Sequence, residues 1–271
     1  MDILATHLAL TMFKNQNKSP FLFNLHTQEG ANTLGHTLIV GGSGSGKTTL
    51  VSWLILNCFK YDINIVVFDK LNGLYSITNY LNGEYIDGNE DNFKLNPFSL
   101  EYSNENKSFL IDWLAKYIDI DKNNLEDVEA IASLQKVLDQ TFRILKQQNT
   151  EFNINEIKES ILKQDNENIK LKLELASLNP IFNALSDSIN LESKLNIINM
   201  DFIESLEKEA GLIAYYVLYK ILYLAKIKLR DFSVLLMSLE HINNHLILDR
   251  INYIITQARK VNGVIALPYK I

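Results

Sequence analysis

The chain has 271 residues, of which 47% are hydrophobic and 21% charged, and its formal net charge is −6. This length is enough to bury a sizeable core, while the acidic balance gives no support from charge alone to a nucleic-acid partner. The sequence shows neither a secretory leader nor an unbroken run of about 18 apolar residues, so no transmembrane segment is predicted.

The single cysteine, Cys58, cannot form an internal disulfide and is expected to be a small core residue. This usage is typical of a reducing, cytoplasmic setting. The two tryptophans, Trp53 and Trp113, are also expected in the core, because each falls within an apolar stretch with helical spacing.

Residues 1–36 are predicted to form a lead-in segment. Within it, residues 20–26 have the apolar, aromatic character of a short strand, and residues 28–32 that of a turn.

The most informative motif follows a short apolar strand at residues 37–40. It reads Gly41-Gly42-Ser43-Gly44-Ser45-Gly46-Lys47-Thr48 and fits G-x-x-x-x-G-K-[ST]. Residues 49–56 are expected to form the helix that leaves it. A strand, a glycine-rich turn and a helix are the context in which this motif binds nucleotide phosphates.

Each residue type in the motif has a physical role. Backbone N–H groups and the positive end of the helix attract an anion, and the glycines let the backbone approach it closely. We expect Lys47 to reach the β- and γ-phosphates and the Thr48 hydroxyl to bind Mg²⁺. The predicted cofactors are therefore ATP and Mg²⁺, held by residues 41–48 together with Thr49.

A second strand is predicted at residues 63–69 and ends in Asp69. With the first strand and the intervening helix it would form a βαβ unit, so the two strands are expected to pair in parallel. Ligands gather at the carboxyl ends of such strands, where Asp69 and Lys70 should lie. The alternative is that Asp69 caps the helix that follows it.

Residues 104–185 are predicted to be a largely helical insertion. Residues 105–147 show apolar residues with a 3.6-residue period, and Asn123 with Glu126 resembles a capping box. Residues 151–185 fit either a strand or a helix, and a helix is favoured.

The remaining segments return to the core. Strands are expected at 195–201, 232–239 and 264–267, and helices at 205–229 and 246–260. The predicted fold is α/β, with a mainly parallel sheet flanked by helices. Its core comprises residues 37–103 and 186–271, and the insertion of residues 104–185 lies between these two parts.

Six segments, taken in chain order, resemble the ATPase domain of the VirB-four family of type IV secretion ATPases. They are Phe21 to His26, Gly35 to Gly41, Phe68-Asp69-Lys70 with Gly73, Leu95-Asn96-Pro97-Phe98, Asp201 with Glu204, and Gln257 to Gly263. The resemblance covers nearly the whole chain. Family members usually carry a large domain before this one and continue past the last strand, so the chain is expected to correspond to part of such a protein.

The resemblance implies a RecA-like P-loop fold and an ATP-driven role in secretion or conjugation. It implies a homo-oligomer, a hexamer being possible, on the cytoplasmic face of the inner membrane. The expected partners are other type IV secretion components. It also assigns Glu240 as the residue that polarises the attacking water, while Arg259 is either an arginine finger acting across a subunit boundary or a solvated helix-end residue.

Two positions depart from the family pattern. Leu239 stands where the family has the aspartate of its second nucleotide motif, and Pro268 stands where it has a phosphate-sensing glutamine. A leucine offers no oxygen to a metal-bound water, and a proline has no side-chain amide and no N–H. We therefore expect ATP binding with slow or absent turnover, unless the fold brings another acid such as Asp69 or Asp201 close.

Three functions remain open from the sequence. The first is an ATP-driven motor domain, and the second is a nucleotide-binding scaffold with little turnover. The third is a DNA-translocating ATPase of the same superfamily, against which the acidic charge and the family matches argue.

Overall fold

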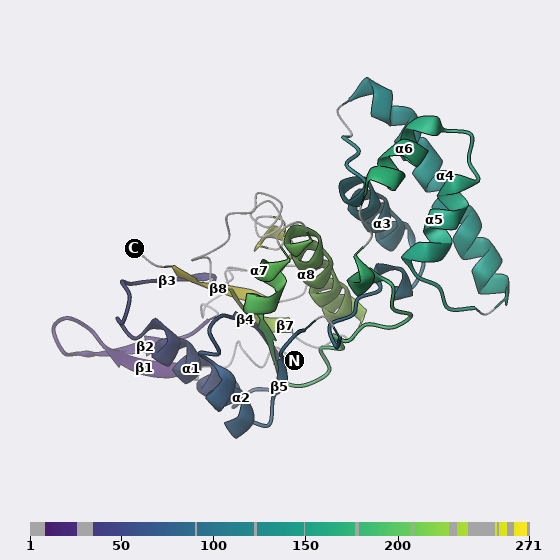
Figure 1. The fold of residues 1–271 in the computed structure, drawn as a ribbon. Helices are drawn as coiled ribbons and strands as arrows, with labels where there is room; N and C mark the ends of the chain where they lie inside the picture. The colour runs from purple at the N-terminus through teal and green to yellow at the C-terminus, as the bar shows by residue number, and fades with distance from the viewer. Residues whose placement is uncertain are drawn as a thin grey trace. The chain divides into compact units, whose positions relative to one another are not determined.

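The computed structural model describes residues 9–25, 35–89, 91–121, 124–148, 150–176, 179–206, 209–227, 232–237, 253, 255–258 and 263–269 (Figure 1). The chain divides into two compact units. Unit 1 comprises residues 1–87 and 191–271, and unit 2 comprises residues 88–190. The predicted insertion, residues 104–185, falls within unit 2.

Unit 1 contains a six-stranded sheet with the order β3-β8-β7-β4-β6-β5. All five neighbouring strand pairs are parallel. The strands are β3 (Thr37–Val40), β4 (Asn64–Asp69), β5 (Glu84–Ile86), β6 (Leu195–Asn199), β7 (Phe232–Met237) and β8 (Val264–Tyr269). Every residue of β4 from Ile65 to Asp69 is buried, so both faces of this strand are covered, as expected for a parallel sheet. The predicted α/β class is confirmed.

One expectation about the sheet is wrong. Strands β3 and β4 are parallel, but they are not neighbours, because β8 and β7 lie between them. Both intervening strands come from the end of the chain. A βαβ pattern fixes the direction of two strands, but a helical crossover is long enough to pass over strands that are added later.

Helix α1 (Lys47–Cys58) packs against one face of this sheet. Its buried residues share a cluster with alternate residues of β4, β6 and β8; those of α1 are Val51, Leu54, Ile55 and Cys58. Cys58 is a core residue, as predicted, and burial raises the pKa of its thiol to about 12. Trp53 is a correction: its side chain is 47% exposed, and its indole N–H donates to Thr11 Oγ1 at 2.9 Å. It lies on the side of α1 away from the sheet, which the sequence spacing did not distinguish.

Three further helices belong to unit 1: α2 (Tyr75–Tyr80), α7 (Met200–Ser205) and α8 (Ala210–Ile227). The predicted strand at 195–201 ends earlier, at Asn199, because the Asn199 side chain accepts the Asp201 N–H at 2.9 Å and caps α7. The predicted helix at 205–229 is confirmed from Ala210 to Ile227 as α8, whereas Ser205 is the last residue of α7. Of the predicted helix at 246–260, residues 253 and 255–258 are helical, and the others lie outside the described residues.

Among the described helices, α8 alone has the length and apolar composition to cross a membrane, and 67% of it is buried in the structure. A helix buried to this extent is typical of a protein core.

The lead-in segment contains a hairpin of two antiparallel strands, β1 (Thr11–Lys14) and β2 (Pro20–Phe23). The strand predicted near residue 20 is confirmed, and its partner β1 was not predicted. Phe13 and Phe23 meet edge to face across the pair, with ring centroids 5.7 Å apart.

Unit 2 is helical. Its helices are α3 (Asn104–Tyr117), α4 (Leu125–Gln148), α5 (Ile154–Leu162) and α6 (Glu167–Leu175), with short 3₁₀ turns η2 (Pro97–Ser99) and η3 (Pro180–Phe182). The ambiguous stretch near residue 170 is a helix, as favoured: Ile169 and Leu173, four residues apart, are buried, whereas Leu171 and Leu175 are exposed. Asn123 of the predicted capping box lies outside the described residues, and α4 begins at Leu125.

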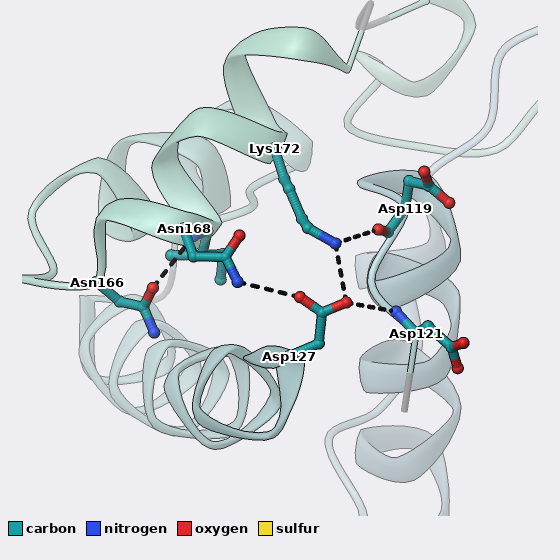
Figure 2. Close-up of polar contacts among 7 residues, drawn as sticks. Asp119, Asp121, Asp127, Asn166, Asn168 and Lys172 are labelled. Atoms are coloured by element: carbon teal, nitrogen blue, oxygen red, sulfur yellow. Dashed lines mark hydrogen bonds and ion pairs between the residues drawn. The ribbon is translucent and has the colours of Figure 1, made fainter. Parts of the chain in front are cut away.

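A buried ion pair links three helical segments of unit 2 (Figure 2). The Asp127 side chain on α4 is 2% exposed, and its Oδ2 atom accepts from Lys172 Nζ of α6 at 2.9 Å. Asn168 Nδ2 and the Asp121 N–H also donate to this carboxylate, each at 3.0 Å. Lys172 Nζ donates in addition to the Asp119 carbonyl, just after α3, at 2.7 Å. The hydrogen bonds from Lys172 hold the pKa of the Asp127 carboxyl below its usual range.

Replacing Asp127 with asparagine is expected to lower the unfolding midpoint of unit 2 at pH 7 by several degrees, because Lys172 loses its buried partner. Because the pKa of Asp127 is lower in the folded protein than in the unfolded chain, its carboxylate stabilises the folded state at pH values above the ordinary carboxyl pKa of about 4. This stabilisation is lost as the pH falls through the pKa of Asp127 in the folded protein. The difference between wild type and Asp127→Asn should therefore narrow below about pH 4. The fluorescence of buried Trp113 in a Trp53→Phe background reports on unit 2.

The matched control is Glu167→Gln, which removes an ion pair from Lys170 on the same α6. Because Glu167 is 84% exposed, this change should leave the midpoint almost unchanged. Equal midpoints for Asp127→Asn and wild type at pH 7 would contradict the assigned role of the buried pair.

Candidate functional site

The glycine-rich loop joins the end of β3 to the start of α1, as predicted. Gly44 and Gly46 have φ angles of 72° and 89°, in the left-handed region that other residues enter only with strain. Gly46 is the N-cap of α1, and the helix begins without a side-chain cap and without an acidic residue in its first turn. The first N–H groups of a helix lack intrahelical partners, so this end of α1 suits an anion.

The loop is also fixed at its base. The Gly41 N–H donates to the Tyr269 carbonyl of β8 at 3.2 Å, and the Ser45 N–H donates to the Gly42 carbonyl at 3.3 Å. Lys47 Nζ folds back over the loop and donates to the carbonyls of Gly41 and Gly42, at 2.9 and 3.1 Å. A phosphate would therefore have to replace backbone carbonyls as a partner of this ammonium group.

The loop is open at three of its glycines. Apart from its chain neighbours, a Cβ atom added at Gly42, Gly44 or Gly46 would meet no atom of the described residues within 4 Å. The positive-φ glycine backbone, a lysine and a helix N-terminus are together the features that bind a nucleotide phosphate. The Thr48 side chain, in the first turn of α1, is exposed and can offer its hydroxyl to a cation.

Asp69, the last residue of β4, is buried and organises the turn that follows. Its Oδ2 atom accepts from the Leu74 N–H at 2.9 Å and from the Tyr85 hydroxyl at 3.0 Å. Leu74 is the N-cap of α2, and no side chain caps this helix, so the alternative that Asp69 caps it is wrong. The carboxylate instead binds the N–H of the N-cap residue and holds the turn before the helix. Burial raises the pKa of the Asp69 carboxyl, and the hydrogen bonds it accepts oppose this shift.

The turn of residues 70–74, here called the 70–74 turn, lies between β4 and α2. Two consecutive non-glycine residues in it have positive φ angles, 57° at Leu71 and 54° at Asn72. Asp201 Oδ2 of α7 accepts the Leu71 N–H at 2.9 Å. Lys70 forms an ion pair with Glu204, also of α7. The turn is thus attached to α7 at two points.

Asn72 is the third fixed point of the 70–74 turn. Its Oδ1 atom accepts from the Tyr85 hydroxyl at 2.9 Å and from Asn199 Nδ2 at 3.3 Å, and Asn199 Nδ2 also donates to Asp87 Oδ1 at 2.8 Å. Sequence reasoning did not single out Asn72, Tyr85 or Asn199. The available signal was their position directly after, or within, strands that end at one sheet edge.

Gly73 brings the 70–74 turn against the nucleotide loop. A Cβ atom at this position would lie 3.2 Å from Thr48 Cγ2 and 3.4 Å from Asp69 Oδ1. The first turn of α1 and the end of β4 therefore flank the same small space, although β3 and β4 are not neighbours in the sheet.

Several residues singled out from the sequence are not placed. Leu239, Glu240 and Arg259 lie outside the described residues, so their roles stay predictions. Pro268 is buried in β8, which extends to Tyr269 rather than ending at the predicted residue 267. Pro268 stands in register with Ile39 of β3, two residues before Gly41. Asp201 lies on α7 and binds the 70–74 turn.

Comparison with curated proteins shows partial sequence similarity to type IV secretion proteins. The chain is 32% identical over 123 residues to the type IV secretion system protein virB4 of Bartonella henselae, a match that covers 45% of this chain and 15% of that protein. It is 33% identical over 122 residues to PtlC of Bordetella pertussis, covering 40% of this chain and 15% of that protein. The matches thus span only a small part of these relatives.

Solved structures share the fold. VirB4 of Thermoanaerobacter pseudethanolicus matches with a TM-score of 0.75 at 15% identity, over 97% of this chain and 77% of that one. The plasmid coupling protein TrwB, in complex with ADP and Mg²⁺, matches with a TM-score of 0.52 at 14% identity, over 86% and 63% of the two chains.

The predicted resemblance is confirmed by these similarities and by a family model. The model, DUF87, is described as "Helicase HerA, central domain" and matches residues 32–221. This P-loop protein therefore belongs to the family of the HerA helicase central domain, with partial sequence similarity to type IV secretion system proteins named virB4 and the fold of a solved VirB4 structure.

Proposed function

We propose that this chain binds ATP with Mg²⁺ and is a motor domain of a type IV secretion apparatus. The observation that carries the proposal is the loop between β3 and α1. It combines two positive-φ glycines, an N-terminal helix end without an acidic residue, and a lysine directed at the loop. These features attract a phosphate group before any chemistry occurs.

The residues of the loop have distinct roles in this proposal. The backbone of residues 41–46 surrounds the phosphates, and Thr49 contributes from the first turn of α1. Lys47 exchanges the carbonyls of Gly41 and Gly42 for phosphate oxygens, which are stronger partners because they are charged. The Thr48 hydroxyl binds the cation. When bound, Mg²⁺ supplies charge neutralisation of the phosphates.

The named relatives support the nucleotide and the cation. TrwB structures contain ADP with Mg²⁺ or non-hydrolysable analogues of ATP and GTP. Because the chain spans 15% of its curated relatives, its partners are inferred for a longer assembly. We place it on the cytoplasmic face of the inner membrane, as part of a homo-oligomer, with a hexamer as one possibility, in contact with other type IV secretion components.

Hydrolysis depends on residues beyond the loop. Glu240 is proposed to polarise the attacking water and Arg259 to stabilise charge on a neighbouring subunit's nucleotide. A second function, a nucleotide-binding scaffold with little turnover, is favoured by one structural observation. Pro268 stands in β8 beside the strand that enters the loop, where it offers neither an amide nor an N–H to a phosphate.

Lys47→Ala is expected to weaken ATP binding about 10- to 100-fold, because a charge-assisted hydrogen bond is lost. Isothermal titration calorimetry with Mg²⁺ and a non-hydrolysable ATP analogue measures the affinity. Lys60→Ala is the matched control: Lys60 follows the far end of α1 and donates to the Leu10 carbonyl at 3.1 Å, so its removal should leave the affinity unchanged. Equal affinities of Lys47→Ala and wild type would contradict a phosphate site at the loop.

Steady-state phosphate release separates the motor from the scaffold. Turnover that Glu240→Gln abolishes supports the motor, whereas turnover no faster than that of Lys47→Ala supports the scaffold. If Leu239 and Pro268 limit turnover, Leu239→Asp combined with Pro268→Gln should raise the rate by at least about tenfold without strengthening ATP binding. An unchanged rate in this double variant would show that the two departures do not limit hydrolysis.

The family description as a helicase domain motivates a test with DNA. A DNA-translocating ATPase would show turnover stimulated by double-stranded DNA and binding that weakens steeply with salt. The net charge of −6 leads us to expect neither effect for this chain alone. Stimulation that disappears between about 50 and 200 mM salt would contradict this expectation.

A further inference from the structure

The carboxylate of Asp69 stands at the carboxyl end of β4, the strand beside β7. Asp69 ends β4, which is hydrogen-bonded to β7, and Phe68 stands in register with Met237, the last residue of β7. Leu239 follows Met237 by two residues in the sequence. Asp69 therefore lies on β4, one residue beyond the last position paired with β7. Leu239 comes after β7 in the sequence.

The two oxygens of Asp69 face different neighbours. Oδ2 holds the 70–74 turn through the Leu74 N–H and the Tyr85 hydroxyl. Oδ1 lies 3.4 Å from the position that a Gly73 Cβ would take, and Thr48 Cγ2 lies 3.2 Å from the same position. Because residue 73 is glycine, it places no side chain of its own between the Asp69 carboxylate and Thr48.

We propose that Asp69 is the positioning residue for the nucleotide's cation, supplying beside Thr48 the negative charge that Leu239 does not provide. The inference deepens the proposed function and rests on it. Mg²⁺ retains several of its waters in proteins and is usually held through one or two carboxylates. A carboxylate beside the threonine that binds the cation can attract the hydrated ion and orient its waters.

Other acids at this edge are engaged in holding the 70–74 turn. Asp201 accepts the Leu71 N–H, and Glu204 pairs with Lys70. Asp69 also has a structural role, since it accepts hydrogen bonds from Leu74 and Tyr85, so a test must separate its charge from its hydrogen bonds. Asp69→Asn does this, because an amide oxygen can still accept from Leu74 and Tyr85 while the negative charge is lost.

The experiment measures ATP-analogue affinity with Mg²⁺ and again with EDTA, by calorimetry, for wild type, Asp69→Asn and Asp201→Asn. It also measures Mn²⁺ bound to the protein–ADP complex by electron paramagnetic resonance. We expect Asp69→Asn to weaken Mn²⁺ binding about 10- to 100-fold and to lose most of the affinity gained from Mg²⁺. The affinity in EDTA should stay at the wild-type value, and Leu239→Asp should restore the gain in the Asp69→Asn background.

Three results would overturn the inference. The first is that Mg²⁺ raises the ATP-analogue affinity of Asp69→Asn as much as it raises that of wild type. The second is that this increase is lost in Asp201→Asn and not in Asp69→Asn. The third is an equal loss of affinity with and without the cation, which marks a purely structural role. Wild type that binds no ATP analogue in either condition overturns the proposed function as well, so the two failures are distinguishable.

Gly73→Ala keeps the carboxylate and provides a second variant should Asp69→Asn fail to fold. Its methyl group would lie between Asp69 and Thr48 and is expected to reduce the gain from Mg²⁺ while sparing the affinity in EDTA. An undiminished gain in Gly73→Ala would count against the inference.

Discussion

Parallel pairing of the six strands is the constraint on which the site depends, because it brings their carboxyl ends to one edge of the sheet. The nucleotide loop follows β3, Asp69 ends β4, and Asn199 ends β6. These residues are far apart in the sequence, and β3 and β4 are separated by two strands. The hydrogen bond from Gly41 to Tyr269 shows how closely the loop depends on the sheet, because it joins the first residue of the loop to β8.

The 70–74 turn is a strained segment at the same end of the sheet, and it contacts the helix that follows the nucleotide loop. The left-handed conformation at Leu71 costs about 1–2 kcal/mol, and that at Asn72 costs less because asparagine tolerates this region. Both persist because hydrogen bonds to Asp201, Tyr85 and Asn199 hold the turn. Backbone strain of this kind is often found at functional sites. Here it accompanies a turn that contacts the first helix turn after the loop at Gly73 and is joined to α7 through Lys70 and Glu204.

Much of the site followed from local sequence patterns. The loop was predicted because its eight residues fit one motif, and the strands because apolar runs of suitable length are bounded by turn residues. Helix α6 was favoured over a strand because Ile169 and Leu173 share a helix face. Local patterns place Asp69 at the end of its strand correctly, but they suggest a helix cap, whereas its carboxylate holds the turn before α2 through the Leu74 N–H.

The features that sequence reasoning missed depend on contacts between distant segments. The neighbours of β3 and β4 are set by strands from the end of the chain, and the exposure of Trp53 depends on which side of α1 meets the sheet. Tyr85 and Asn72 meet only because β5 and the 70–74 turn fold to the same edge. No spacing rule links residues placed together by tertiary packing.

A structure of the protein with Mg²⁺ and a non-hydrolysable ATP analogue tests the central claim most directly. The account predicts that Lys47 Nζ leaves the carbonyls of Gly41 and Gly42 and contacts the β- and γ-phosphates, with the cation at Thr48 on the side of Asp69. A nucleotide bound elsewhere, or phosphates in the loop with Lys47 still on those carbonyls, would contradict it.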